Sequence, residues 1–151
     1  MTLDDILEAL QATPVVLARL VQGLPEETLR AGHGPQRWSI KEVVAHLRDA
    51  DEVSLERFER MAREERPFLP AYDQEAYARE RDYQNSDTAR ALAEFTAIRG
   101  RMVALFRGFS PADLDRPGTH EETGPITIGT LADHVVAHDL VHLGQIARAP
   151  V

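Results

Sequence analysis

The sequence predicts an all-α fold, a four-helix bundle in which a long connection joins the second helix to the third. Apolar residues recur at intervals of three and four over four long segments, as on the buried face of an amphipathic helix. No segment shows a sustained alternation of apolar and polar residues, so we expect no strands. The length of 151 residues is that of one ordinary domain, and we expect a single domain over residues 1–151.

The first two helices have recognisable starts. The first begins after Thr2, which can act as an N-cap, and ends at Gly23. Pro14 lies inside this segment, and we expect a bend there. The second helix begins in WSIKE, where Ser39 is the N-cap and a glutamate three residues later completes a capping box. Its apolar positions continue at helical spacing to about Glu65.

The long connection follows the second helix and covers residues 67–85. It contains two prolines, three tyrosines and many charges without an amphipathic period, so at most part of it is expected to form a short helix. The third helix ends at Gly108, a short helical turn follows at Ser110, and the fourth helix extends to about Arg148. The predicted caps are Ser86 or Asp87 for the third helix and Thr127 or Thr130 for the fourth.

Three histidines in the fourth helix follow one another at spacings of four, in HVVAHDLVHLGQI. Side chains four residues apart in an α-helix differ by only ~40° in direction around the helix axis. His134, His138 and His142 therefore form a row on one face. A core face favours Leu or Val, whereas neutral imidazole is the commonest protein ligand for transition metals. Because the chain has no cysteine, nitrogen and oxygen atoms must hold any metal.

A further donor from a facing helix is needed to complete such a site. His46 is the candidate, since it lies in the second helix beside Val43 and Leu47 and can face inward. One nitrogen from the second helix and two from the fourth would make a three-nitrogen site.

Two segments together carry a family resemblance: WSIKEVVAHLRDADE, at the start of the second helix, and HDLVHLGQI, late in the fourth. In order and spacing along the whole chain the sequence resembles the DinB/YfiT-like family of metalloenzymes. The resemblance implies a four-helix bundle of that type with an unusual connection, often dimeric. It also implies a divalent metal held by His46, His138 and His142. Related members are thiol transferases that use bacillithiol, mycothiol or similar small thiols.

These observations favour a metal-dependent transferase that activates a low-molecular-weight thiol for conjugation to a small electrophile. Three neutral ligands leave the ion its full charge and at least one open position, as in a catalytic site. Zinc or nickel is expected first, although iron, manganese or cobalt would also suit three imidazoles. Two alternatives stay open: a non-catalytic, stress-linked metal-binding bundle, and a metal-dependent hydrolase.

Other polar residues are weighed as catalytic candidates. Asp49 is expected first on the solvated helix surface, but it lies one turn after His46 and could instead orient it or act as a base. Gln145 falls on the histidine face and could hydrogen-bond a ligand or a substrate. His134 is either a ligand, a substrate contact or a packed group. Three further acids are expected on the surface: Asp51, Glu52 and Asp139. Two histidines in predicted loops are also treated as surface residues: His33 and His120.

The net charge and the N-terminal sequence limit the partners and the cellular location that we expect. A formal net charge of -8, from 25 acidic and 17 basic residues, would repel nucleic acid and anionic membranes. No apolar run approaches the ~20 residues of a membrane span, and the first residues lack the pattern of a secretory signal. We therefore expect a cytoplasmic protein. From the resemblance and from the extent of the apolar helix faces we also expect a homodimer.

Overall fold

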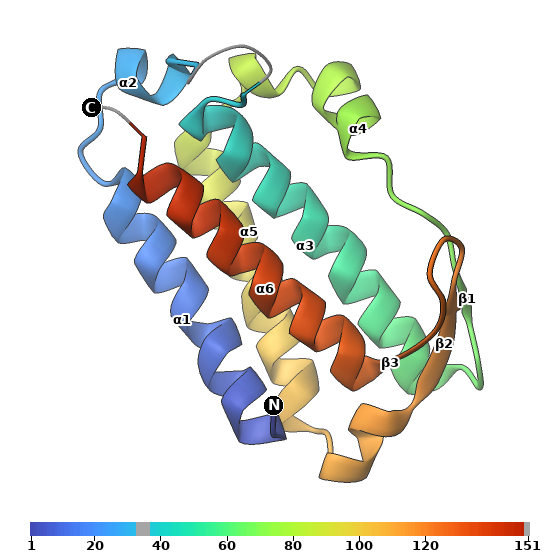
Figure 1. The fold of residues 1–151 in the computed structure, drawn as a ribbon. Coiled ribbons are helices and arrows are strands. Elements are labelled where there is room, and N and C mark those ends of the chain that lie inside the picture. Colours follow the sequence, from blue (N-terminus) through green and yellow to red (C-terminus); the bar gives the residue numbers. More distant parts are fainter. Residues whose placement is uncertain (33–36, 150–151) are drawn as a thin grey trace.

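Four long helices pack side by side in the computed structural model, which describes residues 1–32 and 37–149 (Figure 1). The predicted four-helix bundle is therefore confirmed. Its helices are α1 (Leu3–Val21), α3 (Ile40–Arg63), α5 (Thr88–Arg107) and α6 (Ile128–Ala147). Helix α3 packs against α5 and α6, and α1 packs against the same two helices from the other side. His33 lies outside the described residues.

The long helices begin at the caps that the sequence indicates. Thr2 and Ser39 each form a capping box at the start of α1 and α3. Two N-caps were predicted only as alternatives, and in the structure they are Asp87 for α5 and Thr127 for α6. Each of these side chains accepts a hydrogen bond from the backbone N–H three residues later. Helix α1 continues through Pro14 to Val21 without interruption.

The long connection exists because α3 and α5 run in the same direction. Three contacts show this, since the residue numbers rise together on both helices: Arg48 with Glu94, Asp51 with Arg99, and Glu59 with Arg101. The chain must therefore return along α3 before α5 can begin (Figure 1). The return contains α4 (Gln74–Glu80) and the 3-10 helix η1 (Tyr83–Asn85). Two further short helices are α2 (Glu26–Arg30), which the sequence does not indicate, and the 3-10 helix η2 (Pro111–Asp115).

A small sheet contradicts the expectation that the chain has no strands. It consists of β1 (Phe68–Leu69), β2 (Pro117–His120) and β3 (Gly124–Thr127), with β1 parallel and β3 antiparallel to β2. Strands of two to four residues are too short to show an alternating pattern, and β1 pairs with a strand about fifty residues away. His120 ends β2 and is half-buried rather than fully exposed.

The interior of the bundle is divided into two apolar clusters with a polar layer between them. One residue of the layer comes from each long helix: Thr13, Asp51, Arg99 and Asp139, all buried. Along each helix this residue separates members of the two clusters. Representative residues of the first cluster are Leu10, Leu55, Met102 and Val135, and of the second Leu17, Leu47, Phe95 and Ile146.

Within the described part of the chain, no helix combines the length and the apolar character needed to cross a membrane.

Candidate metal centre

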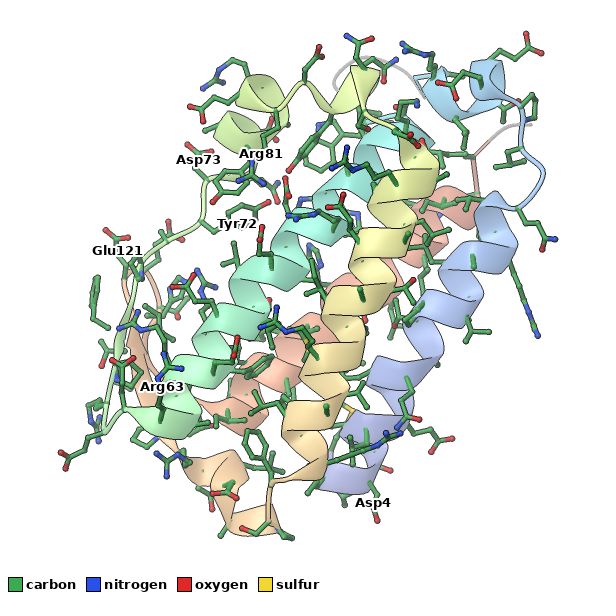
Figure 2. The ribbon with its side chains drawn as sticks, turned by 180° about the vertical axis from the view of Figure 1, so that it is seen from behind. Asp4, Arg63, Tyr72, Asp73, Arg81 and Glu121 are labelled. Carbon is green, nitrogen blue, oxygen red and sulfur yellow. The ribbon has the colours of Figure 1, made fainter. Side chains whose placement is uncertain are left out.

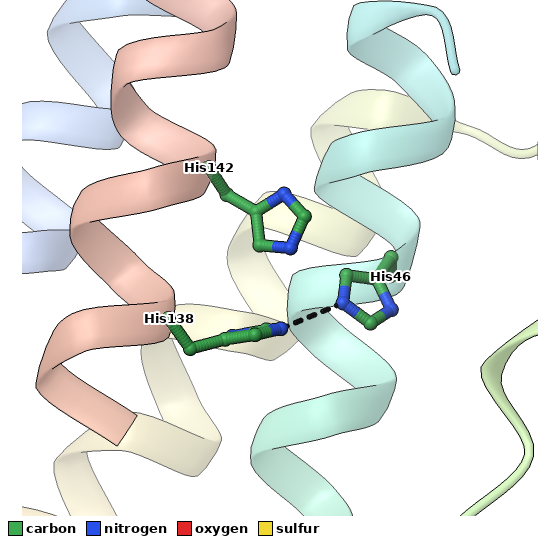
Figure 3. A group of neighbouring side chains, drawn as sticks. All are labelled: His46, His138 and His142. Carbon is green, nitrogen blue, oxygen red and sulfur yellow. Dashed lines mark hydrogen bonds between the residues drawn. The ribbon is translucent and has the colours of Figure 1, made fainter. Parts of the chain in front are cut away.

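Three histidine rings from two helices converge beside the polar layer (Figure 3). His46 extends from α3, and His138 and His142 extend from successive turns of α6. The Nε2 atoms of His46 and His138 are 2.9 Å apart. One nitrogen from each ring can be chosen so that all three lie within 4.8 Å of one another. The inward orientation expected for His46 is observed, since its side chain is fully buried.

The three rings are neutral because they are buried next to one another. Burial, together with the neighbouring His138 and His142, lowers the pKa of His46 to about 3. Burial also lowers the pKa of His138 to about 4 and lowers that of His142. Neutral imidazoles present lone pairs, which is the state that a metal ion requires of its histidine ligands.

The arrangement of donors fits a divalent ion. Two nitrogens that each lie ~2.1 Å from one ion, at right angles to each other, are ~3.0 Å apart, close to the separation of the His46 and His138 nitrogens. The third ring, of His142, has its centroid 4.8 Å from that of His46 and 4.4 Å from that of His138. Three nitrogen donors without a carboxylate or thiolate suit zinc, nickel and similar transition ions.

Gln145 orients one of these rings. Its Oε1 lies 3.0 Å from Nδ1 of His142, one turn away on α6. An amide oxygen can only accept, so this contact places the proton of His142 on Nδ1 and leaves the Nε2 lone pair available. Of the two roles considered for Gln145, the hydrogen bond to a histidine of the row is the one present in the structure.

Asp49 and His134, the other two catalytic candidates, lie in different surroundings. Asp49 is buried rather than on the solvated surface, because its carboxylate accepts hydrogen bonds from Tyr83 and Arg81. No hydrogen bond between Asp49 and His46 is found among the described residues. His134 is exposed and stands outside the group of three nitrogens. It lines a cavity that the three-histidine group adjoins.

The polar layer below the histidines corrects two surface assignments. Asp51 and Asp139, expected to be exposed, are 4% and 3% exposed because both pair with the buried Arg99 of α5. Burial raises the pKa of Asp51, and Arg99 opposes that rise. Periodicity along α3 or α6 cannot reveal a partner that α5 supplies, so this buried group could not be predicted from the helical pattern. Glu52, by contrast, is exposed as expected.

Pro14 explains why Arg99 also contacts α1. Proline has no N–H, so the carbonyl four residues earlier, of Leu10, loses its helical donor. Arg99 Nη1 donates to this carbonyl oxygen at 3.1 Å, and the Thr13 hydroxyl donates to Asp139 at 2.7 Å. The layer therefore joins all four long helices directly beneath the histidines.

A cavity of about 230 Å³ opens from the histidines along the face of α3. Two of the candidate ligands, His46 and His138, line this cavity. His134 and Tyr72, which lies in the connection after β1, also line it. The Tyr72 ring stacks parallel to His46, with centroids 6.3 Å apart, and its hydroxyl is buried without a hydrogen-bond partner among the described residues. Figure 2 shows Tyr72 and Asp73 on the connecting segment that leads to α4. Sequence reasoning missed Tyr72, because a loop residue carries no periodic signal.

Comparison with known proteins gives one consistent result. Residues 9–146 match the family described as the DinB superfamily. A protein of Oceanobacillus iheyensis is 28% identical over 95% of this chain and 83% of its own length. YfiT of Bacillus subtilis is 26% identical over 96% of this chain and 84% of its own length. Both carry the name "Putative metal-dependent hydrolase".

A solved structure of YfiT agrees with this fold. It superposes with a TM-score of 0.84 at 26% identity, covering 97% of this chain and 86% of the other. That structure is described as "YfiT from Bacillus subtilis is a probable metal-dependent hydrolase with an unusual four-helix bundle topology".

Proposed function

Since the chain belongs to the DinB superfamily, we propose that it is a metal-dependent transferase that conjugates a low-molecular-weight thiol to a small electrophile. In this proposal His46, His138 and His142 hold a divalent ion, with zinc or nickel first. The observation that carries the proposal is the convergence of three neutral imidazoles, one buried and two half-buried, beside a cavity of about 230 Å³ that His46 and His138 line. The fold and the metal chemistry agree with the names of the relatives, whereas the thiol is our inference.

The ion's contribution is a positive charge that favours the deprotonated form of a thiol bound beside it. The chain supplies the surroundings in which that charge acts. The ring of Tyr72 covers His46 on one side and helps to exclude water from the site. Gln145 holds the His142 ring in the tautomer that a ligand needs.

The transfer itself requires little from side chains. The thiol gives up its proton to solvent or to His134 at the cavity wall. Its sulfur then forms a bond to the electrophilic carbon, and the leaving group, for example chloride, departs with the electron pair of the bond that breaks. Because the chain has no cysteine, the sulfur must come from the substrate.

The carboxylates around the cavity favour a thiol over water. A hydrolase must deprotonate water and then protonate a leaving group, and a free Asp or Glu commonly serves this purpose. Asp51 is the one carboxylate among the described residues that line the cavity, and Arg99 occupies both of its oxygens. A thiol, with an ordinary pKa of ~8.5, needs less assistance.

Hydrolysis remains the second candidate, because two similar proteins carry that description in their names. In that case His134, the exposed histidine of the cavity wall, is the residue placed to act as the base.

The test is a direct assay of conjugation. Zinc- or nickel-loaded protein is incubated with bacillithiol, mycothiol or glutathione and a chlorinated electrophile, and conjugate is measured by mass spectrometry. We expect a rate well above background with at least one thiol, loss of that rate in His142→Ala or after chelation, and recovery when the ion is returned. His120→Ala, which alters a histidine in the sheet, is the control and should retain the rate.

Two outcomes would replace the proposal. If every thiol reacts at the background rate while an ester or amide is cleaved in a metal-dependent way, the protein is a hydrolase. If neither reaction occurs at full metal loading, the non-catalytic, stress-linked metal-binding bundle is the better description.

A further inference from the structure

We propose that the thiol substrate carries a carboxylate and that Arg57 binds this group at the end of the cavity away from the histidines. This inference rests on the proposed thiol transfer and adds the class of thiol. Arg57 lies on α3 and lines the same cavity as His46 and His138.

The lining of the cavity contains few charged side chains. Two side chains with a formal charge are found among the described residues that line it, Asp51 and Arg57. Arg99 donates to both oxygens of Asp51, so this carboxylate is already paired, whereas Arg57 is the one cation among the described residues that line the cavity. With a net charge of -8, the protein as a whole repels anions, so a site for an anion needs a local cation of this kind.

Arg57 is half-buried and has no close acidic partner among the described residues. No carboxylate lies within 4 Å of its guanidinium in the described part of the chain, and its one side-chain hydrogen bond is from Nη2 to the carbonyl oxygen of Pro70, at 2.7 Å. Burial lowers the pKa of Arg57, and Glu56 and Glu122 oppose this from a greater distance. A guanidinium has five N–H donors, so most of them remain available to a bound carboxylate.

Arg60, on the same helix, differs from Arg57 in having an acidic partner. Its guanidinium pairs with Glu64 at 3.0 Å and donates to the carbonyl oxygen of Phe68 at 2.8 Å. It is not among the residues that line the histidine cavity. Arg60 is therefore a matched control for Arg57.

The positions of His46 and Arg57 along α3 indicate how long the thiol substrate should be. Arg57 follows His46 by eleven residues, which is ~16 Å along a helix axis, and an arginine side chain points back toward the helix start and shortens this gap. The carboxylate and the sulfur should therefore be separated by a chain of several carbons. The wall between them contains Val53, Leu131 and Val135, which suit an apolar chain, and a volume of about 230 Å³ accommodates a small linear acid.

Substrate length and charge can be tested with two thiols of equal length, 6-mercaptohexanoate and its neutral amide. Each is titrated into cobalt-loaded protein, and binding is followed through the absorption band that appears when sulfur coordinates cobalt. The readout is a dissociation constant and does not depend on turnover. We expect the acid to bind about tenfold more tightly than the amide, as for an added charge-assisted hydrogen-bonded pair.

Variants assign the preference to one side chain. Arg57→Gln should bind acid and amide equally while keeping the metal content and helical circular dichroism of the wild type. Arg57→Lys, which keeps the charge but loses the planar donors, should retain part of the preference. Arg60→Gln should retain all of it.

The outcomes separate this inference from the proposed function. A sulfur band with equal affinity for acid and amide in the wild type overturns the carboxylate site and leaves thiol binding intact. A preference for the acid that survives in Arg57→Gln also overturns it. Absence of the band with both thiols rejects the thiol proposal and this inference with it.

Discussion

The Nε2 atoms of His46 and His138 lie 2.9 Å apart, although 92 positions separate the two residues in the chain. At most one proton can lie between two neutral imidazole nitrogens in this arrangement. The same nitrogens are at the separation expected of two ligands of one ion. The contact joins α3 to α6 at the point where we place the metal.

Removal of one ring should release the metal without unfolding the protein. We expect His138→Ala to lower metal affinity at least tenfold, because two imidazoles hold an ion far more weakly than three. Elemental analysis after dialysis measures the loss, and helical circular dichroism should be unchanged. His134→Ala is the matched control, one turn away on α6, and should keep its metal. Equal metal loss in both variants would contradict the three-ligand site.

The metal-free protein should lose stability as the pH falls below about 6.5, the pKa of an unperturbed histidine. Burial lowers the pKa of His46 to about 3 and of His138 to about 4, so the unfolded chain takes up protons at a higher pH than the folded one. The free energy of unfolding therefore decreases from about pH 6.5 down to about pH 3. Urea unfolding at pH 7 and pH 5 measures the change.

The comparison for that experiment is His46→Leu, which removes the largest of these shifts. Its free energy of unfolding should change less between the two pH values than that of the wild type, with both proteins free of metal. An equal change in the two proteins would show that carboxylates, rather than the buried histidines, cause the pH dependence.

Arg99 should contribute more to stability than any exposed arginine of α5. Arg99→Ala leaves Asp51 and Asp139 buried with uncompensated charge, and we expect a loss of about 3–5 kcal/mol in the free energy of unfolding. Arg101→Ala, two residues further on, removes an exposed pair with Glu59 at 3.7 Å and should cost about 0–1 kcal/mol. Chemical denaturation measures both values, and similar losses would contradict this role for the polar layer.

A homodimer should form through the outer face of α1 and α6. Four apolar residues there are at least 40% exposed: Val15, Val16, Leu140 and Val141. They lie at one level of the bundle because Thr13 and Asp139, just before them on each helix, are hydrogen-bonded to each other. Sedimentation at tens of micromolar should give twice the mass of one chain, and Val15→Glu with Leu140→Glu should give the monomer. A monomeric wild type would contradict the prediction.

The four long helices and their caps could be predicted because they depend on neighbours in the sequence. A capping box at Ser39 and a row of histidines at spacings of four are local patterns, and local hydrogen bonds and the helical period give them one structural meaning. His46 was found in the same way, as a histidine on an apolar face. Its partnership with the α6 pair could be expected from the need for a third donor.

The sheet and the polar layer depended on tertiary structure. Strand β1 has two residues and exists because β2, far along the chain, pairs with it. Asp51 and Asp139 read as surface acids on their own helices, and they are buried because Arg99 reaches them from a third helix. Helical periodicity reports which face of one helix is apolar, but it carries no information about the charge that a different helix brings to that face.

The sequence by itself therefore determined the four long helices and the residues able to hold a metal. Only the tertiary structure decided what surrounds them: Tyr72 over His46, Gln145 on His142, and a cavity that extends to Arg57. The physical reason is that helix formation and capping are decided within a few residues. A cavity and a buried ion pair are decided by packing between segments that the chain connects only over long distances.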